Sequence, residues 1–278
     1  MRRIFLIASL LLGLLPLRAF AADAPPYLPN LWDPQHHAAK PDVSALRGLR
    51  IITEDDDPPF HFLLPDGSLS GFDVDLARAI CQELQLTCSI QVRRWDLMAE
   101  ALDANQADAA VASIAITPRS RRVFAFTTPY YKTPARFIAR RDSNLQDISA
   151  QALKGKTIGV LAHSAHAAYL DTFFPQAQIK RYEAADALHA DLRSGAIDAM
   201  FGDGIASSLW LGSADAKNCC MFKGGPYLDP AYFGEGAGIA LKPGNVLIRR
   251  AIDYALAKIA EKGIYTDLYL KYFPIGFY

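Results

Sequence analysis

The sequence predicts an α/β protein with two lobes of similar size and a ligand cleft between them. Apolar strands alternate with helical segments twice, over residues 49–116 and again over residues 153–203. Such alternation is typical of a mainly parallel sheet with helical connections. Extended segments at residues 134–141 and 236–243 join the units. Ligands of open α/β sheets bind beyond the carboxyl ends of the strands, so we expect the site between the lobes.

The chain begins with the features of a secretory signal peptide. Two arginines precede an apolar run over residues 4–15, and Ala19-Phe20-Ala21 fits the small-x-small cleavage rule. The run is shorter than the ~20 residues of a spanning helix. We therefore expect residues 1–21 to be removed and the protein to be exported to the periplasm. An uncleaved membrane anchor is the alternative, because Arg18 is unusual so near the cleavage site.

The charge balance argues against nucleic acid as a partner. Without residues 1–21 the chain holds 26 Lys and Arg against 29 Asp and Glu, a formal net charge of −3. Phosphate binding needs a basic surface, which this balance does not predict. The roughly 255 remaining residues suggest one large domain or two medium ones.

The first unit follows a proline-rich segment, residues 22–47, which we interpret as an extended arm. Its first strand ends in an acidic turn. Next comes a helix in which apolar residues recur at helical spacing, with Asp73 and Asp75 near its start. The remaining elements of this unit are a strand at 88–94, a helix at 95–107, a strand at 108–116 and a closing strand at 134–141.

The second unit repeats the pattern in the order strand, helix, strand, helix, strand. These elements are predicted at residues 153–162, 165–174, 179–184, 185–195 and 196–203. A Gly-bounded strand at 236–243 follows much later. The chain ends in one long predicted helix over residues 245–273.

Four cysteines form two pairs in the sequence. Cys81 and Cys88 lie at the end of a helix and the start of a strand, which in an oxidising compartment indicates a short-loop disulfide. Two buried free thiols are the alternative. Cys219 and Cys220 are adjacent, and the sequence leaves open whether they bond to each other, stay reduced or pair between chains.

Several motifs occur in the order found in periplasmic solute-binding proteins of ABC transporters. They are GSLSGFDVDLARAIC, WDLMAEALDANQADAAVASIAITP, FAFTTPYY, LKGKTIGVL, GAIDAMFGD and YFGEGAGIALKPGN. The chain resembles this family over about residues 48–278, and is most similar to its lysine/arginine/ornithine- and histidine-binding group. The pair Cys81/Cys88 and the ending IYTDLYLKYFPIGFY are the more discriminating points.

The resemblance implies the type II periplasmic-binding-protein fold, with two lobes linked by two crossover strands. Lobe 1 is expected at residues 48–136 plus 240–278, and lobe 2 at residues 137–239. The implied function is to bind a small polar, cationic amino acid or amino-acid derivative, as a monomer, and to deliver it to a membrane permease. No catalysis, cofactor or metal is expected.

For the first lobe, the resemblance places a ligand-stacking aromatic at Trp95 and an acid that reads a basic side chain at Glu54. An indole face attracts a cation by ~0.5–2 kcal/mol. A core position for Trp95 is the alternative. Asp57 stands where relatives often carry a second aromatic, which is a departure. The four adjacent carboxylates of residues 54–57 repel one another unless a cation approaches, although for Asp55 and Asp56 a solvated turn is the better explanation.

The same resemblance implies a grip for the ligand's α-carboxylate, made by hydroxyl groups and an arginine three residues after a threonine. Ser113 and Thr117 persist in this chain. The hydroxyl position between them is Ala115, and the arginine position is Ser120. The grip is therefore shifted or lost.

Neighbouring arginines are the candidates to replace this grip. A guanidinium offers a carboxylate two parallel hydrogen bonds, and a helix start supplies further N–H groups. We expect Arg121 to take the role, with Arg119 as the second choice and Arg122 facing solvent.

In the second lobe, the resemblance assigns the ligand's α-ammonium group to Asp203, which ends a predicted strand. Ser164 occupies the loop that would bind the carboxylate from this side. His163 and His166 flank Ser164, but two histidines are fewer than a metal site needs. We interpret them as residues of the cleft rim or surface.

Two other functions are compatible with the sequence. Some relatives of this fold are dehydratases acting on cyclic precursors of phenylalanine, and Glu54, Asp57 or His163 could act as the acid or base. Similar proteins also occur beside periplasmic quinoprotein dehydrogenases, and the altered carboxylate grip and the N-terminal arm keep an accessory role open. Turnover assays and co-purification distinguish these functions from transport.

Overall fold

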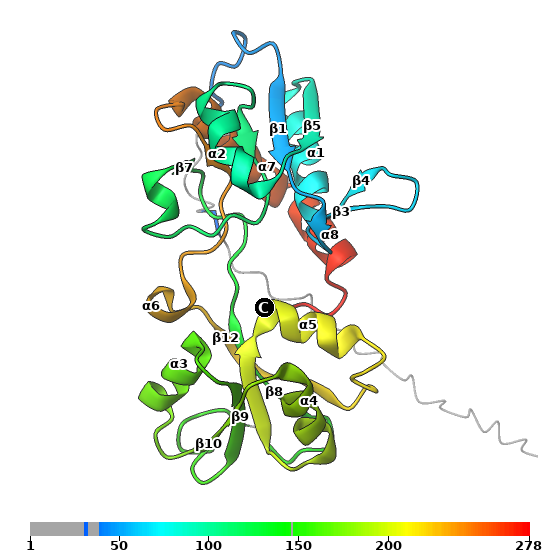
Figure 1. Ribbon diagram of the computed structural model, residues 1–278, viewed down its shortest axis with the longest axis vertical. Helices are drawn as coiled ribbons and strands as arrows, with labels where there is room; N and C mark the ends of the chain where they lie inside the picture. Colours follow the sequence, from blue (N-terminus) through cyan, green and yellow to red (C-terminus); the bar gives the residue numbers. More distant parts are fainter. Residues whose placement is uncertain (1–30, 33–38, 146) are drawn as a thin grey trace, which may run out of the picture.

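The computed structural model describes residues 31–32, 39–145 and 147–278, and these residues form two α/β lobes, one above the other in Figure 1. This arrangement confirms the predicted two-lobed α/β fold. The predicted signal peptide and much of the arm lie outside the described residues. In the described ranges, no helix has both the length and the apolar character needed to cross a membrane.

The upper lobe is built on a five-stranded sheet in the order β5-β1-β6-β13-β7. β5, β1 and β6 are parallel, and β13 is antiparallel to both of its neighbours. The strands are β1 Leu49–Thr53, β5 Cys88–Val92, β6 Ala109–Ala110, β7 Ala125–Phe126 and β13 Ala240–Leu241. The helices are α1 Phe72–Leu84, α2 Trp95–Asp103, α7 Val246–Glu261 and α8 Ile264–Tyr272, with a 3-10 turn at Ser120–Arg122.

The lower lobe contains a second five-stranded sheet, in the order β10-β9-β11-β8-β12. Its strands are β8 Ala135–Arg140, β9 Thr157–Leu161, β10 Gln178–Tyr182, β11 Ala199–Asp203 and β12 Cys220–Tyr227. Its helices are α3 Ala165–Phe173, α4 Ala185–Ser194 and α5 Gly204–Gly212, and a short helix α6, Pro230–Phe233, lies in the second connection between the lobes.

Three details differ from the sequence-based expectations. The strand expected to close the first unit is β8, which instead pairs antiparallel with β11 and β12 of the lower sheet. The long C-terminal helix is two helices, because Gly263 adopts the left-handed backbone region with φ 77°. The acidic turn belongs to a small antiparallel sheet of β2 Asp56–Asp57, β3 His61–Leu63 and β4 Leu69–Ser70.

Helices cover both faces of each large sheet. Because consecutive residues of a strand point to opposite faces, each strand contributes side chains to two hydrophobic clusters. In the lower sheet, Phe137 packs in the cluster that includes α3, whereas Ile138 packs in the cluster that includes α4 and α5. In the upper sheet, Ile51 packs with α1, α7 and α8, and Ile52 packs with α2. The described part of the arm joins the upper core, where the ring of Trp32 lies 5.0 Å from that of Tyr265.

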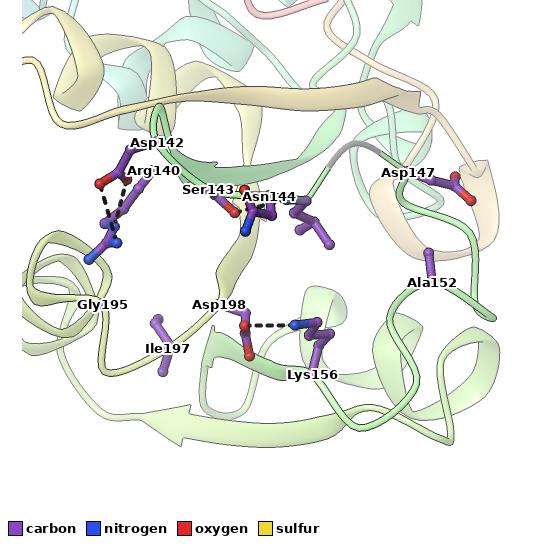
Figure 2. A pocket seen from close by; sticks show the side chains of 11 residues that line it. Arg140, Asp142, Ser143, Asn144, Asp147, Ala152, Lys156, Gly195, Ile197 and Asp198 are labelled. Atoms are coloured by element: carbon purple, nitrogen blue, oxygen red, sulfur yellow. Dashed lines mark hydrogen bonds and ion pairs between the residues drawn. The ribbon is translucent and has the colours of Figure 1, made fainter.

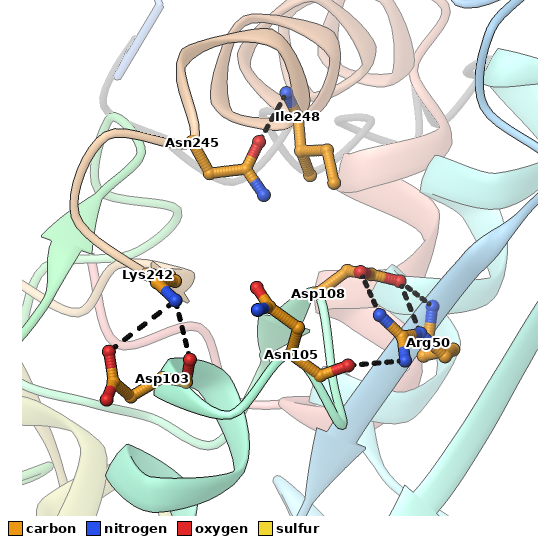
Figure 3. A network of polar contacts seen from close by, with 7 residues as sticks. All are labelled: Arg50, Asp103, Asn105, Asp108, Lys242, Asn245 and Ile248. Carbon is orange, nitrogen blue, oxygen red and sulfur yellow. Dashed lines mark hydrogen bonds and ion pairs between the residues drawn. The ribbon is translucent and has the colours of Figure 1, made fainter.

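An ion-pair network closes the end of the upper sheet where β1 begins (Figure 3). The Arg50 guanidinium donates to both carboxylate oxygens of Asp108, at 3.0 and 2.7 Å, and to the carbonyl oxygen of Asn105 at 2.6 Å. Lys242 pairs with Asp103 beside it. These charges satisfy one another at the amino end of the parallel strands. The network is therefore structural, and the carboxyl ends of these strands point toward the lower lobe.

Both cysteine pairs form disulfides. The predicted bond between Cys81 and Cys88 is present and joins the end of α1 to the start of β5. Cys219 is bonded to Cys220, which selects one of the three alternatives that the sequence left open.

The two disulfides are expected to differ in their effect on stability. Replacing Cys81 and Cys88 with alanine should lower the free energy of unfolding by ~2–3 kcal/mol, because this bond closes a loop in the unfolded chain. The bond between the adjacent residues Cys219 and Cys220 closes no comparable loop, so replacing both with alanine should lower the free energy of unfolding by less. Urea unfolding of both variants checks the difference. If mass spectrometry finds Cys81 and Cys88 alkylated in the unreduced protein, they do not form a disulfide in the exported protein.

Candidate ligand-binding site

The predicted ligand residues follow strands whose carboxyl ends face the middle of the molecule. β1 runs toward the lower lobe and β11 runs up toward α5, so these ends approach one another between the lobes (Figure 1). Glu54 follows β1, Trp95 begins the helix after β5, and Asp203 ends β11. This is the position at which open α/β sheets bind ligands.

Glu54 and Trp95 lie side by side in the upper lobe. The carboxylate oxygen Oε1 of Glu54 accepts a hydrogen bond from the backbone N–H of Trp95 at 2.6 Å, and so caps the start of α2. The Trp95 side chain is 54% exposed, which excludes the core alternative. It borders an apolar pocket of about 230 Å³, which is also lined by Met98, Ile114 and Val123. An exposed indole beside a carboxylate suits a cation with an apolar stem.

Asp57 lies exposed on β2, next to a buried histidine. The Nε2 atom of His61 is 4.0 Å from the Asp57 carboxylate and 3.9 Å from that of Asp73. His61 is only 2% exposed, and neither of its ring nitrogens has a hydrogen-bond partner among the described residues. Burial lowers the pKa of His61, although the nearby carboxylates, Asp57 first among them, oppose this shift.

Asp73 is a fully buried carboxylate that the sequence analysis did not place at the site. It accepts hydrogen bonds from the hydroxyl groups of Tyr130, at 2.9 Å, and Ser113, at 3.0 Å. Burial raises the pKa of Asp73 from its ordinary value of 3.8 to about 7, and these hydrogen bonds only partly oppose it. In the sequence Asp73 looked like a first-turn acid of α1. Its position between two apolar residues, Phe72 and Val74, was the available signal of burial.

The hydroxyl groups near the expected carboxylate grip are bonded within their own segment. Thr117 donates from Oγ1 to the hydroxyl oxygen of Ser120 at 3.1 Å, and Ser120 donates to the carbonyl oxygen of Ala115 at 2.8 Å. Ser120 therefore stabilises the turn itself, whereas an arginine at this position would extend out of the turn toward a ligand. Ala115 is exposed but carries no hydroxyl group.

The two candidate arginines have different surroundings. The guanidinium of Arg121 forms an ion pair with Glu235, on the second connection between the lobes, at 2.5 Å. The backbone of the same connection bonds to Ile116 through the carbonyl oxygen of Gly236. Arg119 is exposed, and no hydrogen bond or ion pair joins its guanidinium to another described residue, although its carbonyl oxygen accepts from the N–H of Arg122 at 3.2 Å. That Arg121 grips a carboxylate stays a prediction, and it would require the ion pair with Glu235 to open.

In the lower lobe, Ser164 and Asp203 cap the helices that follow two paired strands, α3 after β9 and α5 after β11. The Ser164 hydroxyl accepts from the N–H of Ala167 at 3.1 Å and donates to the carbonyl oxygen of Leu161 at 2.7 Å. Asp203 accepts from the N–H of Ala206 at 2.8 Å. Burial raises the pKa of Asp203, and the helix N–H groups and His166 partly offset this.

The two predicted histidines differ in their environment. His166 stacks on Phe233, with ring centroids 5.2 Å apart, and burial lowers its pKa. His163 is exposed. Within the described part of the chain, no cluster of three or more His, Cys, Asp or Glu side chains is arranged to hold a metal ion.

A larger pocket, of about 520 Å³, lies at the opposite end of the lower sheet (Figure 2). Four of its charged residues form two ion pairs, Arg140 with Asp142 and Lys156 with Asp198. Asp198 precedes β11, whereas Asp203 ends it. The pocket therefore faces away from the other lobe and is not part of the candidate site.

The two α/β lobes, with the carboxyl ends of strands from both sheets facing each other, have the fold of a two-lobed solute-binding protein. Over residues 49–275 the chain matches the family described as bacterial extracellular solute-binding proteins, family 3, and it belongs to this family.

Among its relatives, the L-arginine-binding protein of Pseudomonas aeruginosa is 32% identical over 280 residues, covering 100% of this chain and 99% of that protein. The lysine/arginine/ornithine-binding periplasmic protein of Escherichia coli is 30% identical over 87% of this chain and 92% of that protein. In structure, the chain is similar to an ancestral cyclohexadienyl dehydratase, with a TM-score of 0.71 and 20% identity over 87% of this chain and 100% of that one. This last likeness concerns the fold alone.

Proposed function

We propose that this protein is a periplasmic binding protein that captures a small cationic amino acid or amine and delivers it to an ABC-type permease. The observation that carries the proposal is a site divided between the lobes, with Glu54, Asp57 and Trp95 above and Asp203 below. The ligand class is supported by the two relatives, one an L-arginine-binding protein and the other a lysine/arginine/ornithine-binding protein.

We propose that the ligand favours closure of the two lobes. A cation on the Trp95 face beside Glu54 leaves its other end free to meet Asp203 when the lobes approach. Closure removes water from these charges, and charge pairs are stronger in the lower effective dielectric that results. The closed form then differs in shape from the open form, which gives a permease a feature to recognise.

We propose that binding occurs without turnover. Acid–base catalysis needs a titratable group placed over the substrate. In this protein one oxygen of Glu54 caps α2, and Asp73 and His61 are buried in one cluster. The likeness to the dehydratase extends to the fold and carries no residue assignment. Incubating the mature protein with each bound compound and recovering the compound unchanged would agree with a carrier, and a converted product would identify an enzyme.

A thermal-shift screen of basic, neutral and acidic amino acids and of polyamines tests the ligand class. A ligand at 100 times its Kd stabilises the folded state by roughly 2.7 kcal/mol, which shifts the unfolding temperature measurably. We expect shifts only with basic compounds. A shift with acidic or neutral solutes alone would contradict the proposal.

Replacing Trp95 with alanine is expected to weaken binding of the identified cation about 2- to 30-fold, in line with a cation–π contact of ~0.5–2 kcal/mol. Trp95→Phe keeps an aromatic face and should lose less. Because Trp95 is exposed, both variants should unfold at nearly the wild-type urea concentration. Isothermal titration calorimetry measures the effect. Equal affinities for wild type and Trp95→Ala would show that the indole does not contact the ligand.

A further inference from the structure

The first connection between the lobes is held on both sides of Lys132 and Thr133. On the upper side, the ring of Tyr131 packs in the core of the upper lobe. On the lower side, the carbonyl oxygen of Pro134 accepts from the N–H of Gly204 at 2.7 Å, and β8 of the lower sheet follows at once. A change in the orientation of the lobes must therefore be absorbed by the backbone of Lys132 and Thr133.

The second connection can bend beside the first. On its lower side, aromatic rings of α6 pack on α3. On its upper side, the carbonyl oxygen of Gly236 accepts from the N–H of Ile116 at 2.8 Å. Both glycines of residues 234–236 have positive φ, 77° and 108°, which glycine adopts without strain. A side chain in place of Gly236 would collide with the stem of Lys132, so the two bends are neighbours. We call residues 132–133 and 234–236 the hinge.

One tyrosine hydroxyl holds the backbone of this hinge. The Oη atom of Tyr278 accepts from the N–H of Lys132 at 2.9 Å and donates to the carbonyl oxygen of the same residue at 2.7 Å. The Tyr278 side chain is buried and stacks on the ring of Tyr269 in α8, with centroids 5.8 Å apart. The N–H and C=O of a residue change their relative direction whenever its φ or ψ changes. A single hydroxyl therefore keeps both bonds only over a narrow range of hinge angles.

The segment that carries this tyrosine is anchored in both lobes. From the upper lobe, the hydroxyl oxygen of Tyr269 accepts from the N–H of Phe277 at 2.6 Å. From the lower lobe, Arg136 of β8 donates to the carbonyl oxygen of Phe277 at 3.1 Å, and Ser208 of α5 donates to that of Ile275. Figure 1 shows this part of the chain running from α8 to α5. It is a third link between the lobes, made by hydrogen bonds and packing.

We propose that Tyr278 is a brake on lobe closure, because its hydroxyl stabilises the hinge in the orientation of this structure. In this orientation, no hydrogen bond or ion pair between described residues joins Glu54 or Trp95 to Asp203. Bringing these groups together requires different backbone angles at Lys132, which break the paired bonds. A binding-competent form that is less populated lowers the apparent affinity in proportion. The brake goes beyond the proposed ligand class and acts on any solute that closes the lobes.

The variant Tyr278→Phe tests the brake in the ligand-free protein, because it keeps the ring and removes the hydroxyl. Spin labels on Glu100→Cys in the upper lobe and Lys154→Cys in the lower lobe, both exposed positions, report the distance between the lobes by pulsed electron paramagnetic resonance. We expect the minor distance populations to grow roughly 2- to 10-fold, the effect of about one hydrogen bond. Tyr272→Phe is the matched control, since its hydroxyl bonds to Asp75 within the upper lobe. Equal distance distributions in wild type and Tyr278→Phe would overturn the proposal.

Affinity and stability separate a brake from a merely structural contact. With L-arginine, a member of the proposed ligand class, calorimetry should show Tyr278→Phe binding roughly 2- to 10-fold more tightly than wild type. Urea unfolding should show it no more stable than wild type, and Tyr272→Phe should bind like wild type. A structural contact would instead lower stability and affinity together, so weaker L-arginine binding by Tyr278→Phe would overturn the brake. The label measurement needs no ligand and decides the proposal whichever solute the protein binds.

Discussion

Asp203→Asn is expected to weaken binding of the cationic ligand at least thirtyfold while the fold survives. Removing one partner of a buried, hydrogen-bonded charge pair costs about 2–5 kcal/mol, and thirtyfold corresponds to roughly 2 kcal/mol. The substitution is nearly isosteric. Asparagine is also as good an N-cap as aspartate, so the bond from the Ala206 N–H that starts α5 can persist. The effect therefore reports the charge alone.

Asp186→Asn is a suitable control, since Asp186 is an exposed acid in the first turn of α4 in the same lobe. Calorimetric titration with the identified ligand should show the loss only in Asp203→Asn. Urea unfolding should show similar stabilities for both variants. If both variants bind like the wild type, Asp203 is a helix cap without a role in the site.

The second large effect concerns pH and Asp73. Its folded pKa of about 7 lies above the ordinary 3.8, so between these values the folded state keeps a proton that the unfolded state releases. Stability contributed by the protonated form is present below pH 3.8 and is lost as the pH rises through about 7. In Asp73→Asn this loss disappears. We expect the unfolding free energy of the variant, relative to wild type, to rise by up to about 4 kcal/mol between pH 4 and pH 7.

Comparison with wild type is needed because neighbouring groups also titrate. His61 and Asp57 face Asp73, and the lowered pKa of His61 gives stability that is lost as the pH falls, which opposes the Asp73 effect. Tyr130 and Ser113 donate to the two different oxygens of Asp73, and asparagine keeps only one of them, so the pH dependence of the stability difference is the readout and not its absolute size. Urea unfolding across the pH range measures the difference.

Asp75→Asn is the control of opposite sign. Lys271, Tyr272 and Arg78 hydrogen-bond to the Asp75 carboxylate and lower its pKa, so that variant should lose stability relative to wild type as the pH rises. A relative stability of Asp73→Asn that does not change with pH would show that Asp73 is ionised throughout.

Much of the fold could be predicted from patterns among residues that are close together in the sequence. Apolar spacing located α1 and α2, because a helix buries one face at a fixed period. The seven-residue offset of Cys81 and Cys88 indicated their disulfide, and export favoured it. The order of the strands was enough to predict two lobes and to place Glu54 and Asp203 at carboxyl ends.

The sequence by itself therefore determined the lobes, most of their helices and strands, and the family of the protein. Only the tertiary structure decided which polar groups of the site are free. Arg121 meets Glu235 across 114 positions of the chain, and Asp73 meets Ser113 and Tyr130 across 40 and 57. The physical reason is that helix and strand periods depend on neighbours within a few residues. A side-chain hydrogen bond depends only on which groups folding brings within about 3 Å, whatever their separation in sequence.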